Sequence, residues 1–257
     1  MSGATSSGET NSGETGDGVN RETMRVTAAD GRSYDATVVL PESGAGPGIV
    51  LYQEIFGVND FLLGKAADLA KLGYAVCCPD VFWRVEPGVS LPHDEIGLQR
   101  GMSLAGRWMG EVPDDTKVSD LLAVLSQFKA DARVAGGVAV MGYCLGGTLA
   151  YMTAIAGDPA ACVSYYGSGV ADQLGAAGEI KCPVLFHFGD NDSYIPNEHV
   201  EKIKSAFEGR DDVTVRVAHG AGHAFENLLA PAFANPAAAA ESWPVTVEFL
   251  KQQLPVG

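Results

Sequence analysis

Short apolar runs rich in β-branched and aromatic residues recur along the chain, and amphipathic stretches separate the later ones. Apolar strands that alternate with helices build a mostly parallel sheet with helices on both faces. The pattern therefore predicts one α/β domain over residues 21–257, with strands over residues 24–29, 33–40, 48–54, 74–80, 137–143, 161–167, 183–189 and 213–219.

The connections between these runs predict how the sheet begins and where helices lie. Asp30-Gly31, a turn dipeptide of β-hairpins, separates the first two strands, so an antiparallel pair is expected there. The pattern between Phe82 and Asp115 is irregular, as in an excursion that forms one wall of a site. Apolar residues at helical spacing, with Asn59 capping the first segment, predict helices over residues 60–72, 118–128, 145–156, 197–207 and 243–253.

Composition limits the kinds of partner. Residues 1–20 hold twelve Ser, Thr or Gly and three apolar residues, so we expect a disordered tail. The net charge of −15 is opposite in sign to a nucleic-acid-binding face. No apolar run approaches the roughly 18 residues of a membrane helix, and the N-terminus has no signal-peptide pattern. We therefore expect a cytoplasmic protein that binds neither nucleic acid nor membranes; the sequence leaves its oligomeric state open, with a monomer favoured.

The five cysteines are an odd number without a Cys-x-x-Cys pair, which argues against a disulfide framework and a structural zinc site. Four of them, Cys77, Cys78, Cys162 and Cys182, lie in or beside apolar stretches and are expected to be small buried hydrophobes. Cys144 has different neighbours. Neither a metal nor another cofactor is expected.

The strongest chemical signal is the stretch 138–154, where an apolar strand meets Gly142-Tyr143-Cys144-Leu145-Gly146 and then an Ala-rich helix. A nucleophile on a tight elbow needs glycines two residues before and after it, because strand and helix backbones approach closely there. A helix N-terminus also favours thiolate over thiol. Cys144 is therefore the candidate nucleophile; the alternative is a buried cysteine at a glycine-rich turn.

A nucleophile elbow requires an acid and then a histidine further along the chain, each on a loop after a later strand. Asp192 and His223 meet that order: the histidine would move protons and the aspartate would fix its tautomer. Spacing leaves Asp190 as an alternative acid, with the other aspartate then capping a helix. His219 is an alternative base, but the tight Gly-Ala-Gly-His turn favours His223.

Two other interpretations concern histidines. His187 lies inside an apolar strand, which is typical of a core histidine with a satisfied hydrogen bond. A metal site made by His219, His223 and Glu226 would need a regular helix, and the two glycines between the histidines oppose one. The sequence therefore favours a metal-free site.

The third element of the site is the stretch 48–60, a strand that runs directly into Glu54 and Ile55. In α/β hydrolases the loop here supplies one oxyanion-hole N–H, and the residue after the nucleophile supplies the other. Those would be the backbone N–H groups of Ile55 and Leu145. Because Glu54 ends a buried strand at the catalytic edge of the sheet, we expect a catalytic or gating role rather than a plain loop position.

These motifs resemble the dienelactone hydrolases (carboxymethylenebutenolidases), a branch of the α/β-hydrolase fold. The resemblance spans about residues 23 to 252 and rests on residues 53–59, 73–80, 142–147 and 222–225. It implies hydrolysis of a lactone or activated ester through a thioester on Cys144. It also implies that Asp192, in an Asp-x-x-Ile-Pro run, is the acid, and that Glu54 contacts the thiol at rest.

In the resembled family two arginines hold a carboxylate of the substrate. The resemblance puts one near Arg100, whereas the other position, four residues after the histidine, is Asn227 in this chain. This departure predicts weaker binding of anionic lactones. The candidate substrate-binding residues are Phe56, Arg100, Tyr143, Phe225 and Asn227.

Other functions remain as alternatives. A thioesterase or general carboxylesterase would use the same fold and differ in its preference for neutral or anionic esters. A non-catalytic binding protein on a hydrolase scaffold would resist labelling of Cys144 by thiol-directed or ester probes. A redox role for Cys144 is disfavoured, because no resolving cysteine lies nearby in the sequence.

Overall fold

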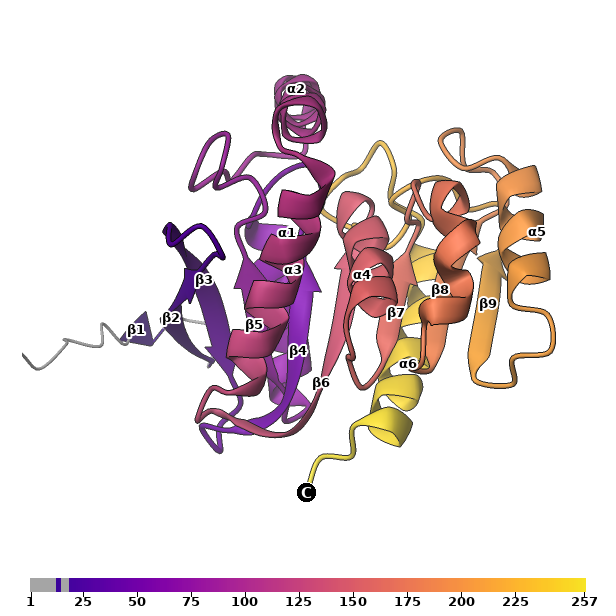
Figure 1. Cartoon of the computed structure of the whole chain (residues 1–257). Helices are drawn as coiled ribbons and strands as arrows, with labels where there is room; N and C mark the ends of the chain where they lie inside the picture. The colour runs from indigo at the N-terminus through magenta and orange to yellow at the C-terminus, as the bar shows by residue number, and fades with distance from the viewer. Residues whose placement is uncertain (1–12, 15–18) are drawn as a thin grey trace, which may run out of the picture.

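The computed structural model describes residues 13–14 and 19–257, and its described strands form one nine-stranded sheet (Figure 1). The strand order is β1-β2-β3-β5-β4-β6-β7-β8-β9, with antiparallel pairing from β1 to β5 and parallel pairing from β5 to β9. The strands are β1 (Gly13–Glu14), β2 (Asn20–Thr27), β3 (Ser33–Leu40), β4 (Gly46–Tyr52), β5 (Ala75–Pro79), β6 (Val134–Tyr143), β7 (Cys162–Tyr165), β8 (Val184–Gly189) and β9 (Val213–Ala218).

Helices cover both faces of the sheet. The helices α3 and α4 pack on β4 and β6, α1 packs on β3 and β5, and α6 packs on β8 (Figure 1). Lys65 of α1 lies 4.4 Å from the ring centre of Trp243 of α6, so these two helices share the second face. The helices are α1 (Asp60–Lys71), α2 (Glu95–Glu111), α3 (Asp114–Lys129), α4 (Leu145–Ala156), the 3-10 segment η1 (Ala171–Glu179), α5 (Asn197–Ala206) and α6 (Pro236–Gln253).

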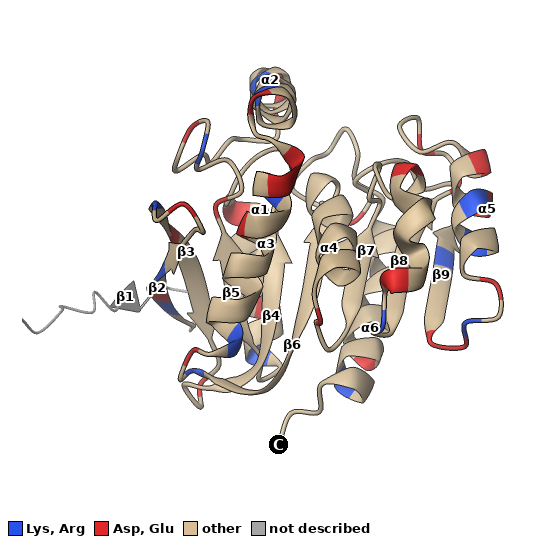
Figure 2. Cartoon of the chain, viewed as in Figure 1, with Lys and Arg blue, Asp and Glu red and all other residues tan. Residues whose placement is uncertain are grey.

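Burial follows the position of each strand in the sheet. Every residue of β4, β5, β7 and β8 is buried, because parallel strands between two helical layers have no solvent face. The central strands β6, β7 and β8 contain no Lys, Arg, Asp or Glu, and Figure 2 shows the charged residues on the helices and loops around them. In the described part of the chain, no helix is long and apolar enough to cross a membrane.

The predicted architecture is confirmed, with differences at three elements. The α/β-hydrolase sheet, its antiparallel N-terminal pair and the helix capped by Asn59 are present. The stretch read as irregular contains the 17-residue helix α2, whose four glycines weaken its helical signal. The last helix begins at Pro236 rather than near Trp243, because Asn235 caps it and Pro244 is tolerated inside. The segment η1 was not predicted.

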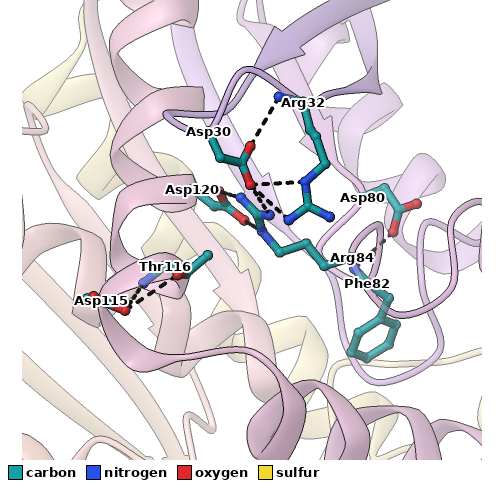
Figure 3. A network of polar contacts seen from close by, with 8 residues as sticks. All are labelled: Asp30, Arg32, Asp80, Phe82, Arg84, Asp115, Thr116 and Asp120. Carbon is teal, nitrogen blue, oxygen red and sulfur yellow. Dashed lines mark hydrogen bonds and ion pairs between the residues drawn. The ribbon is translucent and has the colours of Figure 1, made fainter.

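The loop between β5 and α2 is held by a buried ion pair (Figure 3). The side chain of Arg84 is 6% exposed and donates to both carboxylate oxygens of Asp120 on α3, at 2.5 and 2.6 Å, and to Asp30 at 2.7 Å. Asp80, at the end of β5, accepts from the backbone N–H groups of Phe82 and Gly88. These bonds fix the path of the chain that leads to α2 above the carboxyl ends of the strands.

The N-terminal segment is described only in part. Gly13 and Glu14 form β1 and pair with Arg21 and Asn20 of β2. The expectation of a disordered tail otherwise falls on residues 1–12 and 15–18, which lie outside the described residues.

Candidate active site

Cys144 lies on a strained turn between β6 and α4, with a backbone φ of +55°. A Cβ atom on Gly142 would lie 2.1 Å from the carbonyl oxygen of Gly146, and one on Gly146 would lie 2.2 Å from that of Tyr52. Only glycine permits these approaches, so the two glycines let the elbow close against the end of β4. The predicted elbow is therefore present, with its thiol projecting from the turn.

Three polar side chains form a chain of hydrogen bonds at the carboxyl edge of the sheet. The Sγ atom of Cys144 lies 3.1 Å from Nε2 of His223, and Nδ1 of His223 lies 2.8 Å from Oδ2 of Asp192. The three residues come from loops after β6, β9 and β8. This is the arrangement in which a carboxylate orients an imidazole that exchanges a proton with a nucleophile.

Opposing effects act on the pKa of His223, whose side chain is 9% exposed. Burial lowers its pKa, but the charge of the Cys144 thiolate and the hydrogen bonds to Asp192 and Cys144 outweigh burial and raise the pKa to about 10. These contacts therefore favour the protonated form of the His223 imidazole.

The structure separates the competing acids and bases. The fully buried carboxylate of Asp192 also accepts from the backbone N–H groups of Tyr194 and Ile195, at 2.8 and 3.1 Å. Asp190 instead pairs with His219, whose side chain is 98% exposed. Of these candidates, His223 is therefore the base that contacts the thiol, and Asp192 is the acid bonded to it.

The two backbone N–H groups expected to hold an oxyanion line the same cavity as Cys144. Among the described residues, neither the N–H of Ile55 nor that of Leu145 donates a backbone hydrogen bond. Leu145 is the first residue of α4, where N–H groups carry partial positive charge. Both groups are therefore free to bind an oxygen of a reacting carbonyl.

Glu54 lies two residues after the end of β4, lines the same cavity as Cys144 and is 3% exposed. Its Oε2 accepts a hydrogen bond of 2.7 Å from the side-chain amide of Asn227, and its Oε1 has no partner among the described residues. The expected resting contact between Glu54 and the Cys144 thiol is not the one observed, because the thiol faces His223 and the carboxylate faces Asn227.

His93, which the sequence analysis did not single out, completes this second polar cluster. Its Nε2 lies 2.9 Å from Nδ2 of Asn227 and 3.1 Å from Nδ2 of Asn59. Both amides are fixed in orientation, because their oxygens accept from the backbone N–H groups of Leu229 and Leu62. Nε2 faces these two amide donors and accepts from them in the tautomer that carries its proton on Nδ1. His93 thereby orients the amide that holds Glu54.

The cavity in front of Cys144 has a volume of about 180 Å³. One wall is α2, which presents Leu98, Met102, Ala105 and Met109 at the spacing i, i+4, i+7 and i+11. This spacing is visible in the sequence, although the glycines of the helix obscure it. The irregular stretch does form a wall of the site, as expected, but as a helix.

Several of the expected substrate-binding residues need correction. Phe56 and Asn227 line the cavity, but Arg100 does not. Arg100 lies two residues from Leu98, on another side of α2, and pairs with Glu86 at the surface. Tyr143 and Phe225 are fully buried and pack against other aromatic rings, so they support the site from the core without forming its wall.

The remaining candidates serve the scaffold. His187 is buried, its Nε2 lies 2.9 Å from the Thr246 hydroxyl, and burial lowers its pKa to about 3. Glu226 pairs with Lys65, and burial raises the pKa of this carboxyl despite that partner. His219, His223 and Glu226 thus have three separate sets of partners and do not share a metal site.

The fold and the Cys–His–Asp arrangement define an α/β hydrolase with cysteine at its elbow. The model of the dienelactone hydrolase family matches residues 34–254, and the chain belongs to this family.

Curated relatives agree with this membership, and a solved structure agrees with the fold. The chain is 37% identical over 237 residues to a carboxymethylenebutenolidase of Pseudomonas sp. (strain P51), covering 92% of this chain and 97% of the relative. It is 34% identical to a carboxymethylenebutenolidase of Pseudomonas putida, covering 85% and 91%. The fold matches a dienelactone hydrolase-like promiscuous phosphotriesterase from metagenomic libraries, with a TM-score of 0.75, 24% identity and coverage of 92% and 99%.

Proposed function

We propose that this protein hydrolyses a small-molecule lactone or ester through a thioester on Cys144. The observation that carries the proposal is the continuous hydrogen-bonded chain from Sγ of Cys144 through His223 to Asp192, which opens onto a cavity. The names of the relatives, carboxymethylenebutenolidases, support the same reaction class.

In the first half of the reaction, the Cys144 thiolate attacks the carbonyl carbon of the substrate. A C–S bond forms and the carbonyl oxygen becomes an oxyanion, which the N–H groups of Ile55 and Leu145 stabilise. The oxyanion then collapses, the bond to the leaving oxygen breaks, and the His223 imidazolium gives this oxygen its proton. The products of this half are a thioester and an alcohol, which in a lactone stays attached to the acyl group.

In the second half, a water molecule replaces the alcohol. His223, now neutral, takes a proton from the water as its oxygen attacks the thioester carbon, and the same N–H groups hold the second oxyanion. The C–S bond breaks, the carboxylic acid leaves, and the thiolate and imidazolium are restored. Asp192 keeps Nδ1 of His223 protonated throughout and stabilises the imidazolium.

The direct test is to trap the acyl-enzyme. A nitrophenyl ester mixed with the protein and quenched in acid should add one acyl group, which mass spectrometry assigns to the peptide that contains Cys144. Cys182→Ala, which removes a buried thiol outside the site, is the matched control and should be acylated like the wild type. Acylation at another residue, or no acylation during turnover, would contradict the mechanism.

We infer that the protein acts as a cytoplasmic monomer on a small molecule, without a nucleic-acid partner. All five cysteines are free, which suits a reducing compartment, and the net charge of −15 repels polyanions. Sedimentation of the purified protein measures its oligomeric state, and a mass of 26.8 kDa is expected.

A further inference from the structure

The cavity in front of Cys144 is lined by an acidic side chain but by no strongly basic one in the described chain. Its described walls contain no Lys or Arg, and Glu54 lines the same cavity as the reacting cysteine. This carboxylate is 3% exposed and its Oε1 has no hydrogen-bond partner. A second carboxylate brought into the same small cavity would meet it across a medium of low dielectric constant, where repulsion between like charges is strong.

The cations near the site are engaged elsewhere. Lys65 pairs with the buried Glu226, and Arg100 pairs with Glu86 on the outer surface. The side-chain amide of Asn227 in the cavity wall gives its hydrogens to Glu54 and to Nε2 of His93. No Lys, Arg or free side-chain amide of the described cavity wall is therefore left to neutralise an anionic group of a substrate, and the His223 imidazole is already bonded to Asp192 and Cys144.

The opposite wall offers apolar contacts instead. Leu98, Ala105 and Phe233 line the interior, and Met102 and Met109 continue the apolar surface to the rim, where they are 53% and 57% exposed. Exposed methionines at a rim adapt to ligands of different shape. Each methylene buried there by a substrate is worth about fourfold in affinity at most.

We propose that the site selects uncharged esters and lactones with an apolar acyl group and discriminates against substrates that carry a carboxylate. This selectivity rests on the proposed hydrolytic function and specifies its substrate class. The described cavity wall offers an anion no Lys or Arg and places it in the same cavity as Glu54, whereas an alkyl or aryl group meets the wall of α2.

A matched pair of substrates tests this selectivity. The 4-nitrophenyl ester of glutaric acid is assayed with its far carboxylate free and with that carboxylate methylated. We expect kcat/KM for the methylated ester to exceed that for the free acid by at least about tenfold. A series from nitrophenyl acetate to hexanoate should show kcat/KM rising with chain length until the cavity is filled.

Two variants of α2 make the test specific. Leu98→Arg puts a cation in the cavity wall, so it should raise kcat/KM for the free acid by about tenfold or more relative to the methyl ester. Ile96→Arg is the control, because Ile96 is on the same helix but 77% exposed. At 0.15 M salt this surface charge is screened, so the ratio should stay within about twofold of the wild type.

The outcomes separate the selectivity from the underlying function. If the wild type cleaves both esters and prefers the free acid, or if both arginine variants change the ratio equally, the proposed selectivity is wrong while the hydrolytic function stands. If neither ester acylates Cys144, the hydrolytic function itself is wrong. Should Leu98→Arg fail to fold, the wild-type ratio and the chain-length series still decide the question.

Discussion

The two sides of the cavity are built in different ways. Cys144, Asp192 and His223 each follow a strand of the buried sheet, and backbone hydrogen bonds fix the last two loops to each other, for example from Asn191 to Ala221 at 3.0 Å. The opposite wall, α2, presents apolar side chains that are partly exposed and carry no polar anchor to the site. Rigid strand ends therefore hold the reacting groups, and an adaptable helix contacts the substrate. Changes at the strand ends should alter kcat, and changes in α2 should alter KM.

The largest effect is expected at the elbow. Cys144→Ala should lower kcat by about a thousandfold or more, because the nucleophile is lost while the turn still accepts a small side chain. Cys144→Ser should also be poor, since a hydroxyl is far less acidic than a thiol. Circular dichroism and the melting temperature check that the fold is intact. Retention of more than a few per cent of the esterase activity would contradict this assignment.

The next effect is expected at the acid and the base. His223→Ala and Asp192→Asn should each lower kcat/KM by about a hundredfold or more, because proton transfer loses its base or the base loses its orientation. His219→Ala and Asp190→Asn are the matched controls, since these residues form a separate pair at the surface. Equal losses at both aspartates would show that the observed hydrogen bonds do not decide which carboxylate acts.

A third test concerns His187, the histidine buried in the core outside the catalytic site. His187 has an ordinary pKa of 6.5, which burial lowers to about 3 with a contribution from the charge of Arg216. Because the folded form binds its proton less readily than the unfolded form, stability is lost as the pH falls below 6.5. By pH 5 this loss reaches about 2 kcal/mol.

His187→Gln, which keeps a hydrogen-bonding group toward Thr246, should remove that loss. Urea unfolding at pH 7 and pH 5 gives the free energy of unfolding of both proteins. The wild type should lose about 2 kcal/mol more than the variant over this range. The same decrease in both proteins would mean that His187 titrates normally in the folded state.

A smaller effect is expected in α2. Met102→Ala removes apolar contact from the rim of the cavity, so KM for a hexanoate ester should rise about three- to tenfold with little change in kcat. Ile96→Ala, on the exposed side of the same helix, should change neither constant. A fall in kcat instead of a rise in KM would mean that α2 takes part in positioning the reacting groups.

This difference between the two sides also explains what the sequence could predict. The elbow, Asp192 and His223 are recognisable because glycines and strand ends define a backbone path that only certain residues permit. Asn59 identifies the start of α1 in the same way, through a local hydrogen bond. Features determined within a few residues are therefore visible in one sequence.

The position of α2 depends on contacts that are distant in the chain, so the sequence predicted a wall of the site here but not the helix that forms it. Arg84 pairs with Asp30 and Asp120, and these long-range bonds hold the loop that delivers α2. Because the sequence does not show how this loop positions α2, Arg100 was expected to line the site. The structure places Leu98 there instead. His93 was missed because its partners Asn227 and Glu54 come from loops that only the fold brings together.

The smallest effect is expected at the N-terminal segment, of which the structure describes only β1, at the edge of the sheet. Deleting residues 1–18 should leave both the melting temperature and kcat unchanged, within about 2 °C and twofold respectively. The segment holds only Met1 and Ala4 as apolar residues, so it can bury little surface to offset the entropy of ordering. Its described contact is the two-residue strand β1 at the edge of the sheet, and β2 keeps its eight paired residues with β3 after the deletion. Val19, which is 5% exposed, remains as the first core residue.

A deletion that stops after residue 12 and so keeps β1 is the control. If the longer deletion lowers the melting temperature clearly and the shorter one does not, β1 contributes to stability; a fall in kcat would show that this edge of the sheet communicates with the site.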